Sequence, residues 1–256
     1  MITLYIIFGF IFGSIIGSFL NVVIYRLYKE KSLGGFSACP ACKHKLAALD
    51  LIPIFSFFLL AGKCRYCKSK ISWQYPLVEL ITGILFSLIV FQAVSGTLLS
   101  LNVIFELVFV SILVVIFTFD LIYYLIPDEM VLIGAGLAIV YRLIVYDMSL
   151  VDGFWGALAV GGFFAILFFA SGGRWIGFGD VKLGIFLGLL LGLAPSLTML
   201  MLAYVSGAIV GVVMVAAKKR TMKGILPFGT FLTAATVVIL LFGGTIQSWY
   251  SNFLLL

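Results

Sequence analysis

Eight stretches of this 256-residue chain are apolar over lengths that approach or reach those of membrane-spanning helices, and they constrain the fold more than any other feature. A membrane-spanning helix needs about 20 mainly apolar residues. The stretches are 2–24, 76–95, 98–119, 130–147, 153–171, 181–195, 196–217 and 228–247. We therefore expect an all-α polytopic membrane protein with about eight transmembrane helices.

The composition supports this expectation, because 64% of the residues are hydrophobic and 10% are charged. A soluble domain has about 45–50% apolar and about 25% charged residues. The first stretch lacks a basic leading region and exceeds the roughly 7–15 apolar residues of a secretory signal, so we interpret it as a retained span. The net charge of +6 reports membrane topology rather than nucleic-acid binding. We expect membrane lipid as a partner and no nucleic acid.

The sixth and seventh stretches are separated only by residues 194–196 (APS), so their boundary is the least defined. Glycines recur through both at four-residue spacing, a pattern that favours close packing of membrane helices. These glycines are Gly184, Gly188, Gly192, Gly207 and Gly211.

The positions of the Lys and Arg residues predict the orientation. Residues 25–75 hold nine of the sixteen, the 172–182 turn holds two and the 218–227 turn holds four, which leaves only Arg142 elsewhere. Since basic residues collect in cytoplasmic loops, we expect all three segments in the cytoplasm. With eight spans, both termini would then lie outside.

Four cysteines form two CxxC pairs, Cys39 with Cys42 and Cys64 with Cys67, separated by 21 residues. Two such pairs supply the four thiolates that structural zinc prefers. A cytoplasmic location argues against disulfides, and the absence of a βαβ pattern argues against a thioredoxin-like redox role. Four cysteines without a ligand remain the simpler alternative. The neighbouring His44 is interpreted as a solvated residue rather than a ligand.

Residues 25–75 are therefore expected to form a small cytoplasmic zinc-knuckle domain between the first and second spans. The apolar segment 51–61 within it is too short to cross a membrane. It is interpreted either as the core of this domain or as a segment lying on the bilayer surface.

Two aspartates meet the requirements for a shared site. Asp120 closes the third span and Asp180 opens the sixth within Gly177-Phe178-Gly179-Asp180, so both lie at the cytoplasmic side. Two close carboxyls share a proton, so one can activate water while the other donates to a carbonyl oxygen. Proton-coupled transport also uses paired intramembrane acids, and helix capping is the simplest role for either residue.

The other acidic residues suggest structural roles. Asp128 is interpreted as the N-cap of the fourth span, and Glu106 as a buried acid within the third. Four further acids are interpreted as solvated, namely Glu30, Asp50, Asp147 and Asp152.

Taken in order, the motifs resemble those of bacterial prepilin leader peptidases of the bifunctional type that also N-methylate their product. The matching segments are residues 17–26 (GSFLNVVIYR), the two CxxC pairs, 71–80 (ISWQYPLVEL), 120–128 (DLIYYLIPD), 177–182 (GFGDVK) and 227–229 (PFG). The resemblance runs along the whole chain. It departs from many family members at Ile122, where they carry a second acid.

The resemblance implies a GxGD-type aspartyl peptidase with Asp120 and Asp180 as its catalytic pair. It implies supporting or substrate-positioning roles for Gly177, Gly179, Lys182, Pro227, Phe228 and Gly229. The implied substrates are prepilins or pseudopilins, cut after a glycine at the cytoplasmic face of the cytoplasmic (inner) membrane. The corresponding domains are the first transmembrane helix (1–24), a methyltransferase-associated zinc-binding domain with the four cysteines (25–75) and the peptidase membrane domain (76–256).

The resemblance also implies that S-adenosylmethionine methylates the new amino terminus. The implied parts are the zinc-binding domain and Glu79, with Asn21 and Arg26 in the same region. No glycine-rich nucleotide-binding fingerprint accompanies them. Glu79 alternatively forms a structural pair with Arg26 or Lys70.

Two other classes of function remain open from the residues alone. A proton-coupled transporter predicts acids near the midplane and an internal repeat. A zinc-stabilised membrane scaffold predicts that Asp→Asn changes at positions 120 and 180 are tolerated.

Overall fold

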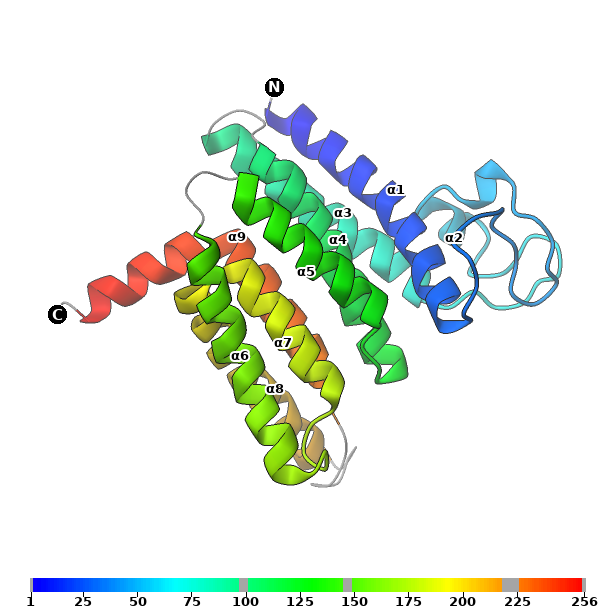
Figure 1. The fold of residues 1–256 in the computed structure, drawn as a ribbon. Helices are drawn as coiled ribbons and strands as arrows, with labels where there is room; N and C mark the ends of the chain where they lie inside the picture. The colour runs from blue at the N-terminus through cyan, green and yellow to red at the C-terminus, as the bar shows by residue number, and fades with distance from the viewer. Residues whose placement is uncertain (1, 97–100, 145–148, 218–225, 255–256) are drawn as a thin grey trace. The chain divides into compact units, whose positions relative to one another are not determined.

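The computed structural model describes residues 2–96, 101–144, 149–217 and 226–254, and over these residues the chain is mainly helical (Figure 1). The helices are α1 (Ile2–Tyr28), η1 (Ala48–Asp50), α2 (Phe55–Leu59), α3 (Gln74–Gly96), α4 (Leu101–Tyr123), α5 (Asp128–Ile144), α6 (Leu150–Ser171), α7 (Phe178–Leu191), α8 (Leu193–Ala216) and α9 (Phe228–Leu254). Within these ranges only isolated β-bridges occur in place of strands. The all-α expectation is confirmed. Asp147 and four basic residues, Lys218, Lys219, Arg220 and Lys223, lie outside the described residues.

The expected membrane helices correspond to α1 and to α3 through α9. Six of them are long and apolar enough to cross a membrane, namely α1, α3, α4, α6, α8 and α9. The other two, α5 and α7, have 17 and 14 residues. At 1.5 Å per residue they reach about 26 and 21 Å, less than the roughly 30 Å of a hydrocarbon core.

The chain divides into two compact units, Met1–Val115 and Ile116–Leu256, with the division inside α4. In the first unit α1 lies along α3 (Figure 1). Gly9, Gly13 and Gly17 make the contact close, because a Cβ at Gly17 would lie 2.8 Å from the Cα of Glu79. This four-residue spacing of glycines on the first span was not among the predicted packing positions.

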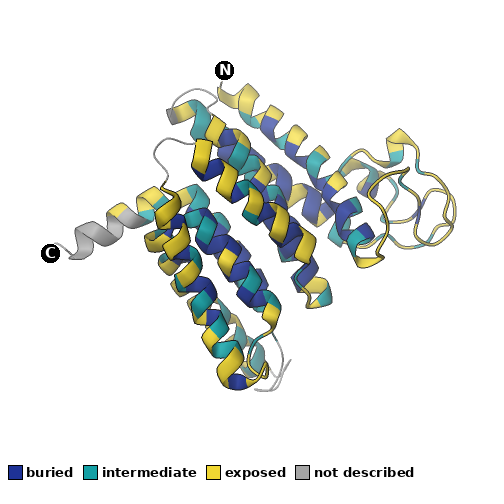
Figure 2. Ribbon diagram, viewed as in Figure 1, coloured by how far each residue is buried: buried dark blue, intermediate teal, exposed yellow. Residues whose placement is uncertain are grey.

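In the second unit α7 packs against α5, α6, α8 and α9. Eight of its 14 residues are buried, which gives it mainly dark blue colouring in Figure 2. Gly184 and Gly188 face α6, and a Cβ at Gly184 would lie 2.8 Å from Phe164 Cδ2. The predicted packing role of these glycines is confirmed.

The boundary between α7 and α8 lies at Gly192, not at residues 194–196 as predicted. Gly192 has a φ of 84°, a left-handed conformation that glycine adopts without strain. Pro195 instead lies in the first turn of α8, where backbone N–H groups have no helical partner and proline is tolerated.

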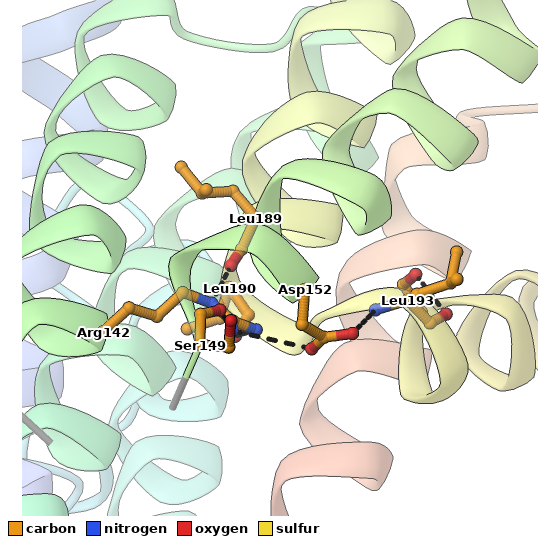
Figure 3. A network of polar contacts seen from close by, with 7 residues as sticks. Arg142, Ser149, Asp152, Leu189, Leu190 and Leu193 are labelled. Carbon is orange, nitrogen blue, oxygen red and sulfur yellow. Dashed lines mark hydrogen bonds and ion pairs between the residues drawn. The ribbon is translucent and has the colours of Figure 1, made fainter. Parts of the chain in front are cut away.

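A buried arginine satisfies the carboxyl-terminal end of α7 (Figure 3). Arg142 donates from Nε to Leu189 O (2.5 Å), from Nη2 to Leu190 O (3.2 Å) and from Nη1 to Ser149 O (2.7 Å). Asp152 lies 3.6 Å from Arg142 Nη1 and accepts the N–H of Leu193 at 3.1 Å. The expectation that Asp152 is merely solvated is therefore wrong, because its carboxylate joins the end of α7 to the start of α8.

We predict that Arg142→Met lowers the free energy of unfolding by at least about 2 kcal/mol, since it leaves buried carbonyl groups without their charged donor. Thermal unfolding of the detergent-solubilised protein, followed by circular dichroism, measures the effect. Asp152→Asn is the matched control. Its amide oxygen still accepts the Leu193 N–H, and the ion pair that it loses is half exposed, so it should cost less than about 1 kcal/mol. Equal stability of Arg142→Met and the wild type would contradict this account.

Candidate active site and metal centre

The two predicted aspartates meet within the second unit. Asp120 lies in the last turn of α4 and Asp180 in the first turn of α7. Only 5% and 9% of their surfaces are exposed. Gly179, directly before Asp180, and Gly229, beside Asp120, both pack against Ile126. The structure thus brings together two carboxyls that are sixty residues apart in the sequence.

The start of α9 fixes the orientation of Asp120. The N–H of Thr230 donates to Asp120 Oδ2 at 2.7 Å. The Thr230 hydroxyl donates to Pro227 O at 2.7 Å, and the Thr233 hydroxyl donates to Gly229 O at 2.8 Å. The segment 227–229 therefore leads into the helix turn whose Thr230 N–H binds the first aspartate.

Helix amino termini gather around this pair. Asp120 accepts from the first turn of α9, and Asp180 belongs to the first turn of α7. Asp128 begins α5 and forms an ion pair with Lys182 of α7. Asp128 is therefore the first helical residue rather than the predicted N-cap. Unpaired N–H groups and the helix dipole make such ends favourable for carboxylates.

Ile126 is a site residue that was not predicted from the sequence. Its side chain packs between two glycines, since an added Cβ would lie 3.2 Å from Ile126 Cβ at Gly179 and 3.1 Å from Ile126 Cδ1 at Gly229. Tyr124, with a φ of 57°, follows α4 and turns the chain toward this position. An apolar residue directly before Pro127 was the available signal, because such residues adopt extended conformations.

Aromatic rings hold the remaining motif residues. The Phe228 ring lies 4.8 Å from Tyr204 and 5.9 Å from Phe164, between centroids. Phe178, in the GFGD motif, lies 5.4 Å from Phe168. Tyr204, whose ring lies beside that of Phe228, was not predicted as a site residue.

The four cysteines of the first unit form one cluster, with all Sγ atoms within 4.8 Å of one another. Cys39 and Cys67 Sγ are 3.9 Å apart, close to the roughly 3.8 Å edge of a tetrahedron with 2.3 Å metal–sulfur bonds. Hydrogen bonding from the Cys42 backbone lowers the pKa of Cys39 to about 6, which favours the thiolate. This arrangement can hold a metal ion that prefers four thiolates. His44 is not part of the cluster, as expected.

The two CxxC segments also share their backbone geometry. Lys43 and Lys68, which follow the second cysteine of each pair, have φ values of 59° and 61°. The N–H of Lys43 donates to Cys39 O at 2.8 Å, and that of Lys68 donates to Cys64 O at 3.0 Å. Each knuckle closes with an isolated bridge, Ala38 to Lys45 and Lys63 to Lys70. The two halves of the centre are therefore a short structural repeat.

Asp50 supports this domain and is not solvated as predicted. Its side chain is 3% exposed and accepts from Arg65 Nε at 2.6 Å and from Tyr66 Oη at 3.2 Å. The Ala47 N–H donates to it at 3.1 Å. The carboxylate thus joins η1 to the second knuckle.

The three residues associated with methylation have separate partners in the first unit. Asn21 donates to Tyr75 O at 3.1 Å, which connects α1 to the start of α3. Glu79 accepts the N–H of Ile54 at 2.6 Å, ahead of α2. Among the described residues Glu79 forms no ion pair with Arg26 or Lys70, so that alternative is not supported.

Arg26 organises the loop that follows α1. Its guanidinium donates to five successive carbonyl oxygens, those of Ser32, Leu33, Gly34, Gly35 and Phe36. Asn21 and Glu79 therefore share the α1–α3 contact, whereas the guanidinium of Arg26 is occupied by the backbone.

Comparison with known proteins places these features in a family context. Two family models match, the bacterial peptidase A24 N-terminal domain over residues 11–93 and the type IV leader peptidase family over residues 107–212. The first range contains the four cysteines and the second contains both aspartates.

Curated relatives cover nearly all of the chain. Prepilin leader peptidase/N-methyltransferases of Aeromonas hydrophila and Bacillus subtilis are each 32% identical to it, over 98% and 94% of this chain and 96% of each relative. One from Myxococcus xanthus is 36% identical over 85% of this chain and 65% of the relative. No solved structure matches the chain.

We predict that Gly229→Ala lowers the free energy of unfolding by about 1–3 kcal/mol, as expected for a side chain forced into a packed site. The added Cβ would lie 2.9 Å from Asp120 Oδ2. Gly136→Ala in α5 is the control, since a Cβ there meets nothing within 4 Å and alanine favours helix. In thermal unfolding, Gly136→Ala should leave the stability unchanged or raise it. A Gly229→Ala protein as stable as the control would contradict the proposed crowding.

Proposed function

The chain belongs to the family of bacterial prepilin leader peptidases/N-methyltransferases, and we propose that it cleaves the leader peptide of type IV prepilins or pseudopilins and N-methylates the new amino-terminal residue. The observation that carries the peptidase half is a pair of buried aspartates, Asp180 in the first turn of α7 and Asp120 in the last turn of α4, which accepts a hydrogen bond from the first turn of α9. Both lie in the range that matches the type IV leader peptidase family.

Asp120 and Asp180 are proposed to act as a general acid–base pair. Like charges at short range disfavour double ionisation, so the two carboxyls share one proton. The ionised carboxylate takes a proton from water, which attacks the scissile carbonyl, and the protonated carboxyl donates to the carbonyl oxygen. The carboxyl that took the proton from water then donates it to the leaving amine, while the other carboxylate takes back the proton from the hydroxyl of the tetrahedral intermediate as its carbonyl re-forms, so the pair is regenerated with one shared proton.

The surrounding residues are proposed to position this pair and the substrate. The Thr230 N–H holds one carboxylate, and the N–H of Asp180 donates to Gly177 O at the start of α7. Gly179 and Gly229 allow Ile126 to pack closely between them. Lys182, two residues after Asp180, pairs with Asp128, and Phe228 anchors the start of α9 through its ring contacts.

The location of the reaction follows from charge. Fifteen of the sixteen Lys and Arg residues fall in segments that the positive-inside rule assigns to the cytoplasm. We propose a multi-pass protein of the cytoplasmic membrane with both the aspartate pair and the cysteine domain at the cytoplasmic face. The transporter alternative expects acids near the midplane, whereas these two lie in terminal turns of their helices.

The methyltransferase half is proposed to reside in the first unit. S-adenosylmethionine supplies the methyl group when bound. The buried carboxylate of Glu79 suits a cationic sulfonium or ammonium group, and it also positions α2 through Ile54. Asn21 keeps the start of α3 against α1, and Arg26 shapes the loop that leads into the cysteine domain.

We propose zinc as the metal of the four-cysteine cluster, because four thiolates at tetrahedral spacing suit it. Its role would be structural, since four protein ligands leave no open position. The metal would hold the two knuckles together and so stabilise the domain that carries α2.

We predict that Asp120→Asn and Asp180→Asn each reduce cleavage of a prepilin by about 10²–10⁴-fold, the usual contribution of general acid–base catalysis. Cleavage of a co-expressed prepilin, followed by gel mobility and mass spectrometry, measures the effect. Glu129→Gln is the control, because Glu129 is an exposed acid in the first turn of α5. Near wild-type cleavage by either aspartate variant would rule out the proposed catalytic role of the pair.

We predict about one zinc ion per purified chain, and that Cys67→Ser lowers zinc content and methylation while leaving cleavage largely intact. The cysteines and the aspartates belong to different compact units, so the peptidase site should survive. Elemental analysis and the mass of the processed amino terminus measure the two effects. Ser69→Ala, which removes a hydroxyl 3.1 Å from Cys67 Sγ but keeps all four thiols, should retain zinc. Wild-type protein without stoichiometric metal would rule out the zinc site.

A further inference from the structure

The segment around α2 presents an apolar face that the cysteine domain does not cover. Only Phe57 of this helix is buried. The face comprises Ile52, Phe55, Phe58, Leu59 and Trp73, whose exposed fractions range from 41% to 69%. Of the two interpretations of segment 51–61, the domain core therefore applies to Phe57 and not to most of its neighbours.

Contacts with α3 place this α2 face at the level where a membrane span begins. Trp73 directly precedes α3, whose residues Gln74–Ser95 are long and apolar enough to cross a membrane. The Trp73 ring lies 4.9 Å from that of Phe57 and 6.3 Å from that of Phe58. Glu79, inside the span, holds Ile54. Tryptophan is enriched at membrane–water interfaces, so Trp73 at the start of α3 favours an interfacial position for the α2 face.

Two lysines lie beside the same face. Lys63 and Lys70 oppose each other across an isolated antiparallel bridge. Together with Phe57, Phe58 and Trp73 they line a cavity of about 510 Å³. Neither lysine forms an ion pair with any described residue. Directly opposed like charges are destabilising unless an anion lies between them, so the arrangement favours an anionic ligand.

We propose that the α2 face inserts into the headgroup region of the membrane and that Lys63 and Lys70 bind the phosphate of an anionic phospholipid. The interfacial depth, the exposed apolar side chains and the paired positive charges all fit this one occupant. Basic residues also predominate through segment 25–75. One of the two acids in this segment, Asp50, already forms an ion pair with Arg65. The lipid would fix α2 and, through Ile54, the environment of Glu79.

The test uses the full chain with Trp73 as its only tryptophan, made by Trp155→Phe, Trp175→Phe and Trp249→Phe. The protein is reconstituted into phosphatidylcholine nanodiscs that contain a small fraction of lipid with brominated acyl chains, which quench nearby tryptophan. The brominated lipid is either phosphatidylglycerol or phosphatidylcholine at the same fraction. The ratio of the two quenching efficiencies reports enrichment of the anionic lipid beside Trp73.

We expect quenching by both lipids, with brominated phosphatidylglycerol enriched roughly tenfold, because each lysine near an anionic surface contributes severalfold to affinity. Lys63→Gln with Lys70→Gln should reduce the ratio to about one. Lys43→Gln with Lys68→Gln is the control, since it removes the same amount of charge. These two lysines occupy corresponding positions of the two knuckles and do not line the cavity. Zinc content verifies that both variants keep the domain folded.

Three results would overturn the proposal. Absence of quenching by either lipid would show that the α2 face contacts water or a soluble partner and not the bilayer. Equal loss of enrichment in both lysine variants would indicate diffuse surface charge rather than a site. Loss of quenching on addition of S-adenosylmethionine would assign the cavity to that cofactor.

Discussion

The hydrogen bond from the Thr230 N–H to the Asp120 carboxylate is the contact on which the candidate active site depends. It joins residues 110 positions apart and satisfies two groups that are costly to bury alone, a carboxylate and an orphan donor at a helix start. The neighbouring glycines make it possible. A side chain at Gly229 would meet both Asp120 and Ile126, and one at Gly179 would meet Ile126. Ile126 therefore sets the separation between the segments that carry the motifs. The geometry of the site depends on the absence of side chains at Gly179 and Gly229 as much as on the two acids.

Both units use close helix contacts to place their acids. In the first, a Cβ at Gly17 would collide with the backbone of Glu79, so the glycines of α1 set the position of that acid against its neighbour. In the second, Gly184 and Gly188 let α7 approach α6, and α7 carries Asp180 in its first turn. Lipid is as apolar as leucine, so membrane helices gain little from burying large side chains and associate instead through close packing. Glycine spacing therefore bears on function here, although no glycine takes part in the chemistry.

The sequence was sufficient for those parts that depend on local pattern or on fixed spacing. Hydropathy located the helices, the two CxxC pairs predicted the cysteine cluster, and the ordered motifs singled out Asp120 and Asp180. It was insufficient for residues whose partners are distant. Arg142 was only an exception to a charge count, yet it binds carbonyls 47 and 48 residues away. Asp50 was interpreted as solvated because its partner Arg65 lies in another knuckle. Ile126 had no polar chemistry to draw attention. Such pairings arise from tertiary packing, which a single sequence does not display.

The shortness of α7 connects these observations. At about 21 Å it cannot reach across a hydrocarbon core of about 30 Å, so at least one of its ends lies where water is scarce. Unpaired backbone groups at such a depth are costly and need partners from the protein. At the carboxyl-terminal end, the buried guanidinium of Arg142 is this partner for Leu189 and Leu190. At the amino-terminal end, the N–H of Asp180 donates to Gly177 O at 3.2 Å. A short helix with charged groups at both ends can hold a carboxyl below the membrane surface without exposing it to lipid. That position suits hydrolysis of a peptide bond at the edge of a substrate's apolar segment.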